Sequence, residues 1–356
     1  MGNKVMLGMS GGIDSAMSAY FLLQDGKEPT GVNCRFFTND DANIKQKTCC
    51  SLDDSQDARL VAYKLGIPFH VFNFTSQFNE NVIKRFIHAY EVGETPNPCI
   101  DCNKYLKFDE MLKRAMQLDF DSIATGHYAI NEFDEKTGRW LLKKALDETK
   151  DQSYVLYSLS QFQLSKILFP LGTKKKSEIR VLAEELGLAI AKKHDSQDIC
   201  FVPDSDYAGF IEKYSGKSYP DGEFVDLQGN VLGTHKGIIR YTVGQRRGLG
   251  LALPAPMYVV KKDIENNKVI LGDNQSLLSK TVIAHNINLI PFDKIEGEIR
   301  VKAKIRYNQK EQWATAKQID LDTLYVEFDE PQRAVAKGQS VVLYDGDVVV
   351  GGGIIE

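Results

Sequence analysis

A glycine-rich turn close to the first residue has the composition of an anion site. A short apolar run at 5–7 predicts a buried strand, and apolar residues at helical spacing from Ile13 to Leu23 predict a helix after the turn. Adjacent glycines let the backbone approach a phosphate where a Cβ would clash, and the amides of a helix N-terminus attract anions. We therefore expect the turn to bind phosphate groups through Gly8, Met9, Ser10, Gly11, Gly12, Ile13, Asp14 and Ser15.

The acidic residue of this turn, Asp14, is a predicted magnesium ligand, because Mg²⁺ is usually held by one or two carboxylates together with phosphate oxygens. No lysine follows it, so the turn is not the G-x-x-x-x-G-K-[ST] loop of common nucleotide triphosphatases. The pattern S-G-G-x-D-S at 10–15 resembles instead the pyrophosphate loop (PP-loop) of enzymes that split ATP between its α and β phosphates and adenylate a substrate. The alternative is a glycine-rich strand–helix turn that binds nothing.

Two cysteines stand three positions apart in GETPNPCIDCN, at 99 and 102. The two prolines before them predict an ordered loop, followed by a helix that begins near Asn103 and whose positive end would lower the pKa of Cys102. The C-x-x-C pattern alone fits a redox pair or half of a zinc site. The zinc alternative lacks a convincing second half, since Cys49, Cys50 and His194 do not supply ligands at matching spacing.

Composition limits the class of protein. A chain of 356 residues is longer than one core usually supports, so we expect two or three domains. A net charge of −4 argues against indiscriminate nucleic-acid binding, although it is compatible with a local basic face. No basic and apolar leader precedes the first predicted strand, and no stretch approaches a membrane span. We expect a cytoplasmic protein that uses its six cysteines as thiols, metal ligands or catalysts rather than as structural disulfides.

Strand and helix patterns alternate over the first part of the chain, which predicts an α/β domain with a doubly wound parallel sheet. Gly126 ends one of these strands and is therefore expected near a bound ligand. After about residue 204 the pattern changes to short glycine-punctuated strands, and from Lys280 onward these predict a small closed or nearly closed β-barrel. The predicted domains are 1–204, 205–277 and 278–356.

Six blocks of sequence, taken in order, carry a resemblance to a known family. They are SGGIDS, GETPNPCIDCN with KFD after it, ATGHYA, KDQSYVLY, HDSQDICFVP and YTVGQRRGLG. Together they span nearly the whole chain and resemble the tRNA-specific 2-thiouridylases (the MnmA family). The resemblance implies an adenine nucleotide α-hydrolase-like PP-loop domain, a small central domain and a tRNA-binding barrel. It also implies a sulfurtransferase that replaces O2 of the wobble uridine of tRNA with sulfur.

The implied chemistry needs ATP and a sulfur nucleophile. A urea-like oxygen is a poor leaving group, so the uridine O2 would first attack the α-phosphate of ATP and form an O2-adenylate, with pyrophosphate held by the glycine-rich turn and Mg²⁺. By resemblance, Cys200 carries a persulfide that a cysteine desulfurase or a sulfur-relay protein loads. Cys102 then attacks it, which releases hydrosulfide and leaves a Cys102–Cys200 disulfide, or it assists a direct transfer.

Position 99 departs from the family, because many members have an acidic residue where this chain has Cys99, and that residue is assigned proton transfer. Asp101 is a nearby carboxylate. Cys99, Cys102 and Cys200 could instead hold a [4Fe–4S] cluster with one open iron, as in related tRNA sulfur-transferases. We prefer the persulfide route. Alternatives of other classes are a PP-loop ATP-dependent ligase, a non-catalytic RNA-binding protein and a dithiol redox protein.

The resemblance also implies binding residues. Cys34 and Gly126 would contact the adenine nucleotide, Cys34 through its main chain because methionine is usual at that position. His127 would contact tRNA beside the nucleotide. The segments expected to meet the flipped target base and the anticodon loop are, respectively, Asn97, Pro98 and Cys99, and Lys150, Asp151 and Gln152.

One predicted barrel strand carries cations that alternate with apolar residues and so share one face, namely Arg300, Lys302, Lys304 and Arg306. With Tyr307 next, and with Gln339 on a later strand, this face predicts tRNA contact; the alternative is an ordinary solvated face. Two further patterns lie in the first domain. Glu132 to Trp140 predicts a hairpin, and the lysine run at 174–176 is interpreted as the solvated start of a helix.

Overall fold

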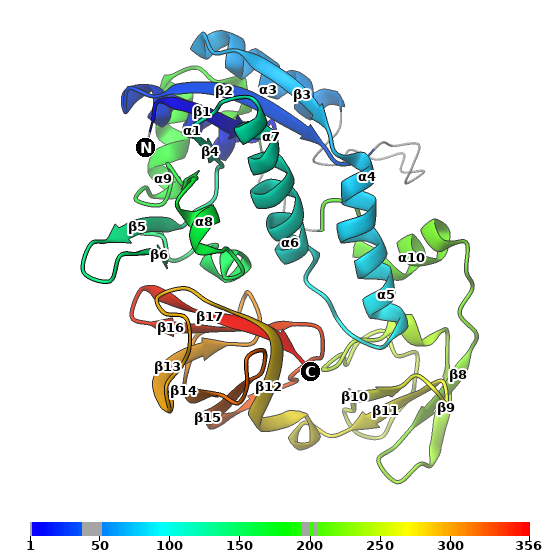
Figure 1. The fold of residues 1–356 in the computed structure, drawn as a ribbon. Coiled ribbons are helices and arrows are strands. Elements are labelled where there is room, and N and C mark those ends of the chain that lie inside the picture. Colours follow the sequence, from blue (N-terminus) through cyan, green and yellow to red (C-terminus); the bar gives the residue numbers. More distant parts are fainter. Residues whose placement is uncertain (1, 38–51, 194–198, 203–204) are drawn as a thin grey trace.

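The computed structural model describes residues 2–37, 52–193, 199–202 and 205–356 (Figure 1). The first domain is built on a five-stranded sheet in the order β3-β2-β1-β4-β7, and all neighbouring strands in it are parallel. This confirms the parallel α/β sheet that the alternating pattern predicts. Its strands are β1 (Lys4–Gly8), β2 (Glu28–Arg35), β3 (Phe69–Asn73), β4 (Ser122–Ala124) and β7 (Ile167–Leu168).

Helices cover both faces of this sheet, as the burial of the β1 side chains on each face shows. Val5 and Leu7 belong to one apolar core and Met6 to the other, and all three are fully buried, as expected for a strand whose side chains alternate between two covered faces. The first core is closed by α1 (Ile13–Gln24), α3 (Leu52–Leu65) and α9 (Lys176–Glu185). The second is closed by two helical runs, one of α4 (Thr75–Phe78), η1 (Asn79–Ile83) and α5 (Lys84–Glu91), the other of α6 (Pro98–Asp101), η2 (Cys102–Glu110) and α7 (Met111–Gln117).

The helix that carries the C-x-x-C cysteines begins earlier than the sequence predicts. We expected a loop through Cys102 and a helix from about Asn103, but α6 already starts at Pro98 and continues into η2. That prediction was wrong because proline is favourable at the first position of a helix, where its missing N–H is not needed. Asn97 caps this start, since its Oδ1 accepts a hydrogen bond from the Cys99 N–H at 3.1 Å.

A smaller unit follows the first domain. It contains α10 (Tyr207–Ser215) and a four-stranded sheet in the order β10-β11-β8-β9. Its strands are β8 (Gly222–Val225), β9 (Val231–His235), β10 (Tyr258–Asp263) and β11 (Lys268–Gly272). Short helical turns elsewhere are η3 (Ser153–Leu156), α8 (Gln161–Leu164), η4 (Ala189–Lys192), η6 (Ile238–Arg240) and η7 (Gln275–Leu277). Among the residues described, no helix combines the length and the apolar character needed to cross a membrane.

The last part of the chain is a closed barrel, which confirms the predicted fold (Figure 1). Its strands are β12 (Leu278–Leu289), β13 (Glu298–Lys304), β14 (Gln312–Gln318), β15 (Leu324–Arg333), β16 (Ser340–Asp345) and β17 (Val348–Ile355), and β12 closes the ring by pairing with both β15 and β17. The predicted hairpin forms as β5 (Ile130–Asp134) and β6 (Arg139–Lys143) and extends the barrel's sheet, because Lys143 pairs with Val348. The domain boundaries at 205 and 277 stay predictions.

Replacing Asn97 with alanine should lower the apparent melting temperature, because a lost helix cap costs about 1 kcal/mol. Asn97→Asp keeps an accepting oxygen at the cap and should melt close to the unchanged protein. Circular dichroism during heating measures both variants. If Asn97→Ala and the unchanged protein melted together, the side chain would not be stabilising the start of α6.

Candidate active site

The phosphate loop (Gly8–Ser15) is held in place by the neighbouring strand. The Met9 N–H donates to the Val32 carbonyl at 2.8 Å, and Asn33 Nδ2 donates to the Met9 carbonyl at 2.9 Å. Within the loop, the Ser10 N–H donates to Ser15 Oγ at 3.2 Å. Gly12, at the N-cap of α1, offers no side chain to the amides of the first turn. The first turn therefore presents backbone N–H groups and a positive dipole end to an anion.

Two glycines in and beside the loop sit where no side chain fits. Gly11 has a φ of +77°, and a Cβ there would lie 2.3 Å from the Asp54 carbonyl oxygen. At Gly126, just past β4, a Cβ would lie 2.9 Å from the Ser15 nitrogen. The structure therefore puts Gly126 against the backbone of the phosphate loop, at the edge of the sheet where the sequence suggested a ligand.

The carboxylate of Asp14 is paired with Lys176, a lysine that its sequence pattern predicts to be solvated. Lys176 Nζ donates to both Asp14 oxygens at 2.7 Å, and the Tyr128 hydroxyl donates to Asp14 Oδ1 at 2.8 Å. The expectation of a solvated lysine run is wrong for Lys176, which is 5% exposed. The signal was present, because Lys176 shares the buried face of α9 with Ile179 and Ala183 at i+3 and i+7.

Cys34 lies at the end of β2, beside the helix that carries Cys102. Its Sγ is 3.8 Å from the sulfur of Met111. Burial raises the pKa of the Cys34 thiol to about 12, with a smaller contribution in the same direction from Cys102 and an opposing one from Lys107. Cys34 is therefore a neutral thiol, which agrees with a packing or main-chain role at the nucleotide rather than a reactive one.

The other two candidate cysteines border one apolar core. Cys102 is buried, and Cys200 is partly buried directly before Phe201, whose ring packs against Phe86 at 5.3 Å. Lys193, shortly before Cys200 in sequence, ties its segment to the phosphate loop, because its Nζ donates to the Gly11 carbonyl at 3.3 Å. His194, Cys49 and Cys50 lie outside the residues described.

The three cysteines of the iron–sulfur alternative are not assembled into a ligand set. In the part of the chain that the structure describes, which includes Cys99, Cys102 and Cys200, no group of three or more His, Cys, Asp or Glu side chains could hold a metal ion. A [4Fe–4S] cluster with one open iron needs three thiolates around it. This arrangement of the chain therefore does not fit the cluster.

The expected tRNA-binding segments meet where the first domain touches the barrel. The Tyr307 hydroxyl donates to the Asp151 carbonyl at 3.1 Å, and Gln339 Nε2 donates to the Thr95 carbonyl at 2.6 Å. Thr95 lies just before the segment 97–99 at the start of α6. Contacts from the barrel thus reach both segments of the first domain that the resemblance assigns to tRNA.

Gln152 connects this junction to the phosphate loop. The Tyr128 N–H donates to Gln152 Oε1 at 3.0 Å, the Gln152 N–H donates back to the Tyr128 carbonyl at 2.9 Å, and Tyr128 itself donates to Asp14. The Asp151 carboxylate accepts from the Ser153 hydroxyl at 2.7 Å, so it shapes this turn, and Lys150 beside it is half-buried. The turn at 150–152 therefore contacts Tyr128, which leads to the phosphate loop, and Tyr307 of the barrel.

His127 is buried rather than exposed. Its ring lies between Phe108 and Phe169, at centroid distances of 5.6 and 6.1 Å, and its Nδ1 is 2.8 Å from the Thr125 hydroxyl. Burial, with a smaller contribution from Lys107, holds the pKa of His127 well below its usual range. The imidazole is therefore neutral, and its contact with tRNA stays a prediction.

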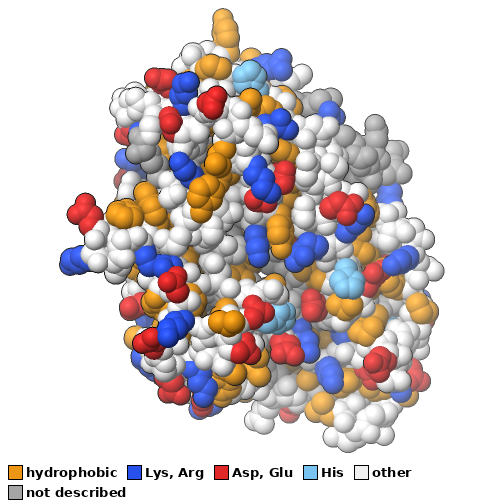
Figure 2. All heavy atoms as spheres, in the orientation of Figure 1, with side chains coloured by type: hydrophobic (Ala, Val, Ile, Leu, Met, Phe, Trp, Pro, Cys, Tyr) orange, Lys and Arg blue, Asp and Glu red, His pale blue; other side chains and the backbone are white. Residues whose placement is uncertain are grey.

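Both arginines expected on the basic face of the barrel strand bind partners within the protein. Arg300, Lys302 and Lys304 do alternate with buried residues on β13, but Arg300 pairs with Asp329, and Arg306 lies beyond the strand and donates to the Ala334 carbonyl at 3.0 Å. On the face of the molecule in Figure 2, basic and acidic side chains are interspersed. Arg300 and Arg306 therefore have partners within the protein, and contact of this strand with tRNA stays a prediction.

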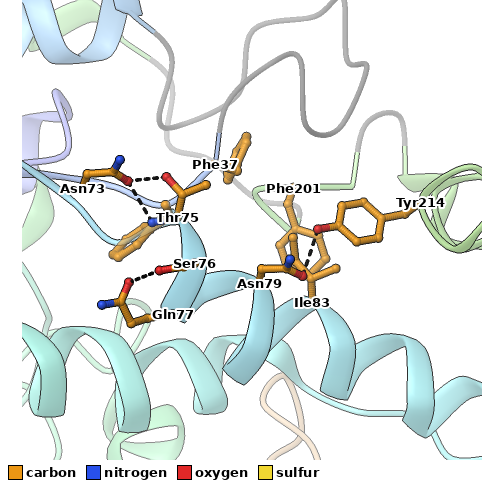
Figure 3. Close-up of a pocket in the computed structure, with 10 residues that line it drawn as sticks. Phe37, Asn73, Thr75, Ser76, Gln77, Asn79, Ile83, Phe201 and Tyr214 are labelled. Atoms are coloured by element: carbon orange, nitrogen blue, oxygen red, sulfur yellow. Dashed lines mark hydrogen bonds between the residues drawn. The ribbon is translucent and has the colours of Figure 1, made fainter.

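A separate cavity of about 530 Å³ lies between the helical run 75–91 and α10 (Figure 3). Tyr214 bridges its two sides by donating to Asn79 Oδ1 at 2.9 Å. None of the predicted site residues lines it, although Phe201 places it next to Cys200. Its lining residues are Phe36, Phe37, Asn73, Thr75, Ser76, Gln77, Asn79, Ile83, Phe201 and Tyr214.

Replacing Gly126 with alanine should displace the phosphate loop. An extra methyl group in a packed site costs about 1–3 kcal/mol, so ATP affinity should fall by roughly tenfold or more. Gly26→Ala is the control, because a Cβ at Gly26, just past the far end of α1, meets nothing within 4 Å even though Gly26 has a positive φ. Calorimetric titration with ATP measures both; equal affinities would remove Gly126 from the nucleotide site.

Cys34 should resist alkylation while the protein is folded. A thiol with a pKa of about 12 is almost wholly protonated near neutral pH, and only the thiolate reacts with iodoacetamide. Mass spectrometry of the Cys34 peptide, with and without prior unfolding, measures the difference. Reaction of folded Cys34 at the unfolded rate would contradict its burial.

Family models match three consecutive parts of the chain. A tRNA methyl transferase HUP domain matches residues 3–204, a tRNA methyl transferase PRC-barrel domain matches 208–273, and an aminomethyltransferase beta-barrel domain matches 279–355. The matches follow the order of the α/β domain, the small middle unit and the barrel.

Relatives match the whole chain. The tRNA-specific 2-thiouridylase MnmA of Clostridioides difficile (strain 630) is 52% identical over 356 residues, which cover 100% of this chain and 99% of the relative. The tRNA-specific 2-thiouridylase MnmA 1 of Thermoanaerobacter sp. (strain X514) is 53% identical over 356 residues, covering 99% of this chain and 98% of the relative. Because identity at this level runs along both chains in full, the protein belongs to the family of tRNA-specific 2-thiouridylases.

Proposed function

We propose that this protein is an ATP-dependent tRNA sulfurtransferase that converts the wobble uridine of tRNA to 2-thiouridine. The observation that carries the proposal is full-length identity of about half the residues to proteins named tRNA-specific 2-thiouridylases. The phosphate loop, with its uncapped helix N-terminus, supplies an anion site of the kind that ATP cleavage needs. A cytoplasmic location, where tRNA and ATP are both present, is part of this proposal.

The first half-reaction activates the base. Uridine O2 attacks the α-phosphorus of ATP as the N3 proton leaves, the bond between that phosphorus and the bridging oxygen to the β-phosphate breaks, and pyrophosphate departs. The amides of the first turn of α1 oppose the charge that grows on the leaving pyrophosphate. The product is an O2-adenylate, whose AMP group is a far better leaving group than oxide.

The second half-reaction delivers sulfur. A cysteine desulfurase or a sulfur-relay protein loads Cys200 as a persulfide. The Cys102 thiolate attacks the inner sulfur of that persulfide, which forms a Cys102–Cys200 disulfide and releases hydrosulfide. Hydrosulfide attacks C2 of the adenylated base, the C2–O bond breaks, and AMP leaves. A thiol reductant must then reduce the disulfide before the next turnover.

Two inorganic groups fit this site differently. Asp14 would hold Mg²⁺ beside the phosphates, where the ion would offset phosphate charge, but both of its oxygens now accept hydrogen bonds from Lys176. Among the described residues no group of three or more His, Cys, Asp or Glu side chains could hold a metal ion, so we derive no step through a [4Fe–4S] cluster. Asp101, the carboxyl near position 99, is turned towards Arg85 at 3.5 Å, and burial raises its pKa.

The junction between the first domain and the barrel is the proposed anticodon site. Asn97, Pro98 and Cys99 form the start of α6, and Cys99 is exposed there. Burial is the main cause of the raised pKa of the Tyr307 hydroxyl. Asp151 and Cys99 lie close enough to contribute in the same direction. A base flipped from the anticodon loop would enter between α6 and the barrel.

Serine replacements at the two cysteines separate the half-reactions. Cys102→Ser and Cys200→Ser should still release pyrophosphate in the presence of tRNA but should form no 2-thiouridine, because a hydroxyl neither carries nor accepts sulfur. Radiolabelled ATP follows the first product, and mass spectrometry of digested tRNA follows the second. Thiouridine from Cys200→Ser would exclude the persulfide route, and thiouridine from Cys102→Ser would exclude attack by the Cys102 thiolate on the persulfide.

Cys99→Asp is the matched variant for the cluster alternative. It restores the acidic residue usual in the family and removes one of the three cluster ligands. We expect thiouridine formation to persist, since the persulfide route does not use Cys99 as a sulfur carrier. Loss of activity together with loss of bound iron would instead support a cluster.

A further inference from the structure

The phosphate loop has no cation of its own, yet the fold brings one to it. In the sequence, no lysine or arginine lies between Lys4 and Lys27. The Lys176 ammonium reaches the first turn of α1 from the start of α9 and lies 2.7 Å from each Asp14 oxygen. In other nucleotide loops a lysine within the motif supplies charge to the outer phosphates. Among the described residues, Lys193 also reaches the loop, at the Gly11 carbonyl, but it is paired with Asp54 and Asp57. The ammonium at Asp14 is that of Lys176, a residue 162 positions away.

The burial of the Lys176 ammonium indicates a role besides stabilising the fold. The Lys176 side chain is 6% exposed, whereas Asp14 keeps 32% of its side-chain surface open. Taking an ammonium out of water is expensive, and a buried ion pair seldom repays that cost in folding free energy. A buried ammonium next to an open carboxylate and an anion-binding helix end is better explained by a charged ligand.

We propose that Lys176 is the phosphate-binding lysine of this loop: when ATP binds, the ammonium leaves Asp14 for oxygens of the β- and γ-phosphates, and Asp14 is released to hold Mg²⁺. This inference rests on the proposed function and names a further residue for its first half-reaction. Lys176 then stays with pyrophosphate as the bond to the α-phosphorus breaks, and so stabilises the leaving group.

The surroundings allow this exchange of partners. The Lys176 main chain is fixed, because its N–H donates to Asp147 Oδ2 at 2.9 Å. The four-carbon side chain can therefore swing while the helix end stays still. Asp14 does not lose all support, since the Tyr128 hydroxyl still donates to it. The exchange moves one positive charge towards the phosphates and leaves an acceptor for a divalent cation.

Ligand binding tests the proposal without relying on turnover. Lys176→Met should weaken binding of ATP and of inorganic pyrophosphate by about tenfold to a hundredfold, as expected for losing a charged hydrogen bond, while AMP binding stays unchanged. Lys175→Met is the matched control, because Lys175 is the adjacent lysine and is exposed. Calorimetry with each ligand gives the affinities. Unchanged pyrophosphate affinity, or equal loss for pyrophosphate and AMP, would overturn the proposal.

Two further variants separate phosphate binding from simple charge balance. Asp14→Asn frees the ammonium, so pyrophosphate should bind more tightly in the absence of Mg²⁺; weaker binding would contradict the exchange. Asp14→Asn combined with Lys176→Met removes both charges and so avoids an unpaired carboxylate if the single variant unfolds. It should still bind pyrophosphate weakly, and normal binding by it would overturn the proposal.

The proposed function is tested separately. If the unchanged protein forms no 2-thiouridine with ATP, tRNA and a persulfide donor, the sulfurtransferase proposal fails regardless of Lys176. If it forms the product and Lys176→Met binds pyrophosphate normally, only the role of Lys176 fails.

Discussion

Close approach of backbone to backbone around the phosphate loop is the constraint on which the rest of the site depends. The Asp54 carbonyl faces Gly11 and the loop nitrogen of Ser15 faces Gly126, both at distances that exclude a Cβ. This packing leaves the first turn of α1 open towards an anion. Asn33 holds the same loop to β2, and Lys193 donates a hydrogen bond to its Gly11 carbonyl. The phosphate loop is thus fixed by residues that lie far apart in the sequence.

The remaining groups of the site differ in charge, and burial decides which of them are neutral. The Cys34 thiol and the His127 imidazole are kept neutral by burial, so neither adds charge to the pocket. Asp14 and Lys176 supply one charge of each sign, and a hydrogen-bonded path through Tyr128 joins them to Gln152 at the junction with the barrel. That path connects the proposed tRNA site at the junction to the proposed phosphate site at the loop through shared contacts.

Local patterns predicted much of this, and tertiary contacts account for what they missed. The glycines of the loop, the alternation of buried residues on β1 and the short strands of the barrel are local signals, and the fold follows them. The prolines before Cys99 predict a loop, but the first helical position favours Pro98. The lysine run at 174–176 predicts a solvated surface, and only the i+3 and i+7 neighbours of Lys176 indicate that it is buried. The joining of β5–β6 to the barrel sheet depends on a pairing more than two hundred residues apart in sequence.

If the uridine oxygen leaves on AMP, an isotope label at that oxygen must be found in the AMP. An anticodon stem–loop carrying ¹⁸O at O2 of the wobble uridine would be thiolated with unlabelled ATP and a persulfide donor, and the AMP analysed by mass spectrometry. We expect the label in the phosphate of AMP, one atom for each thiouridine formed. Thiouridine accompanied by unlabelled AMP, with the label in water, would contradict it.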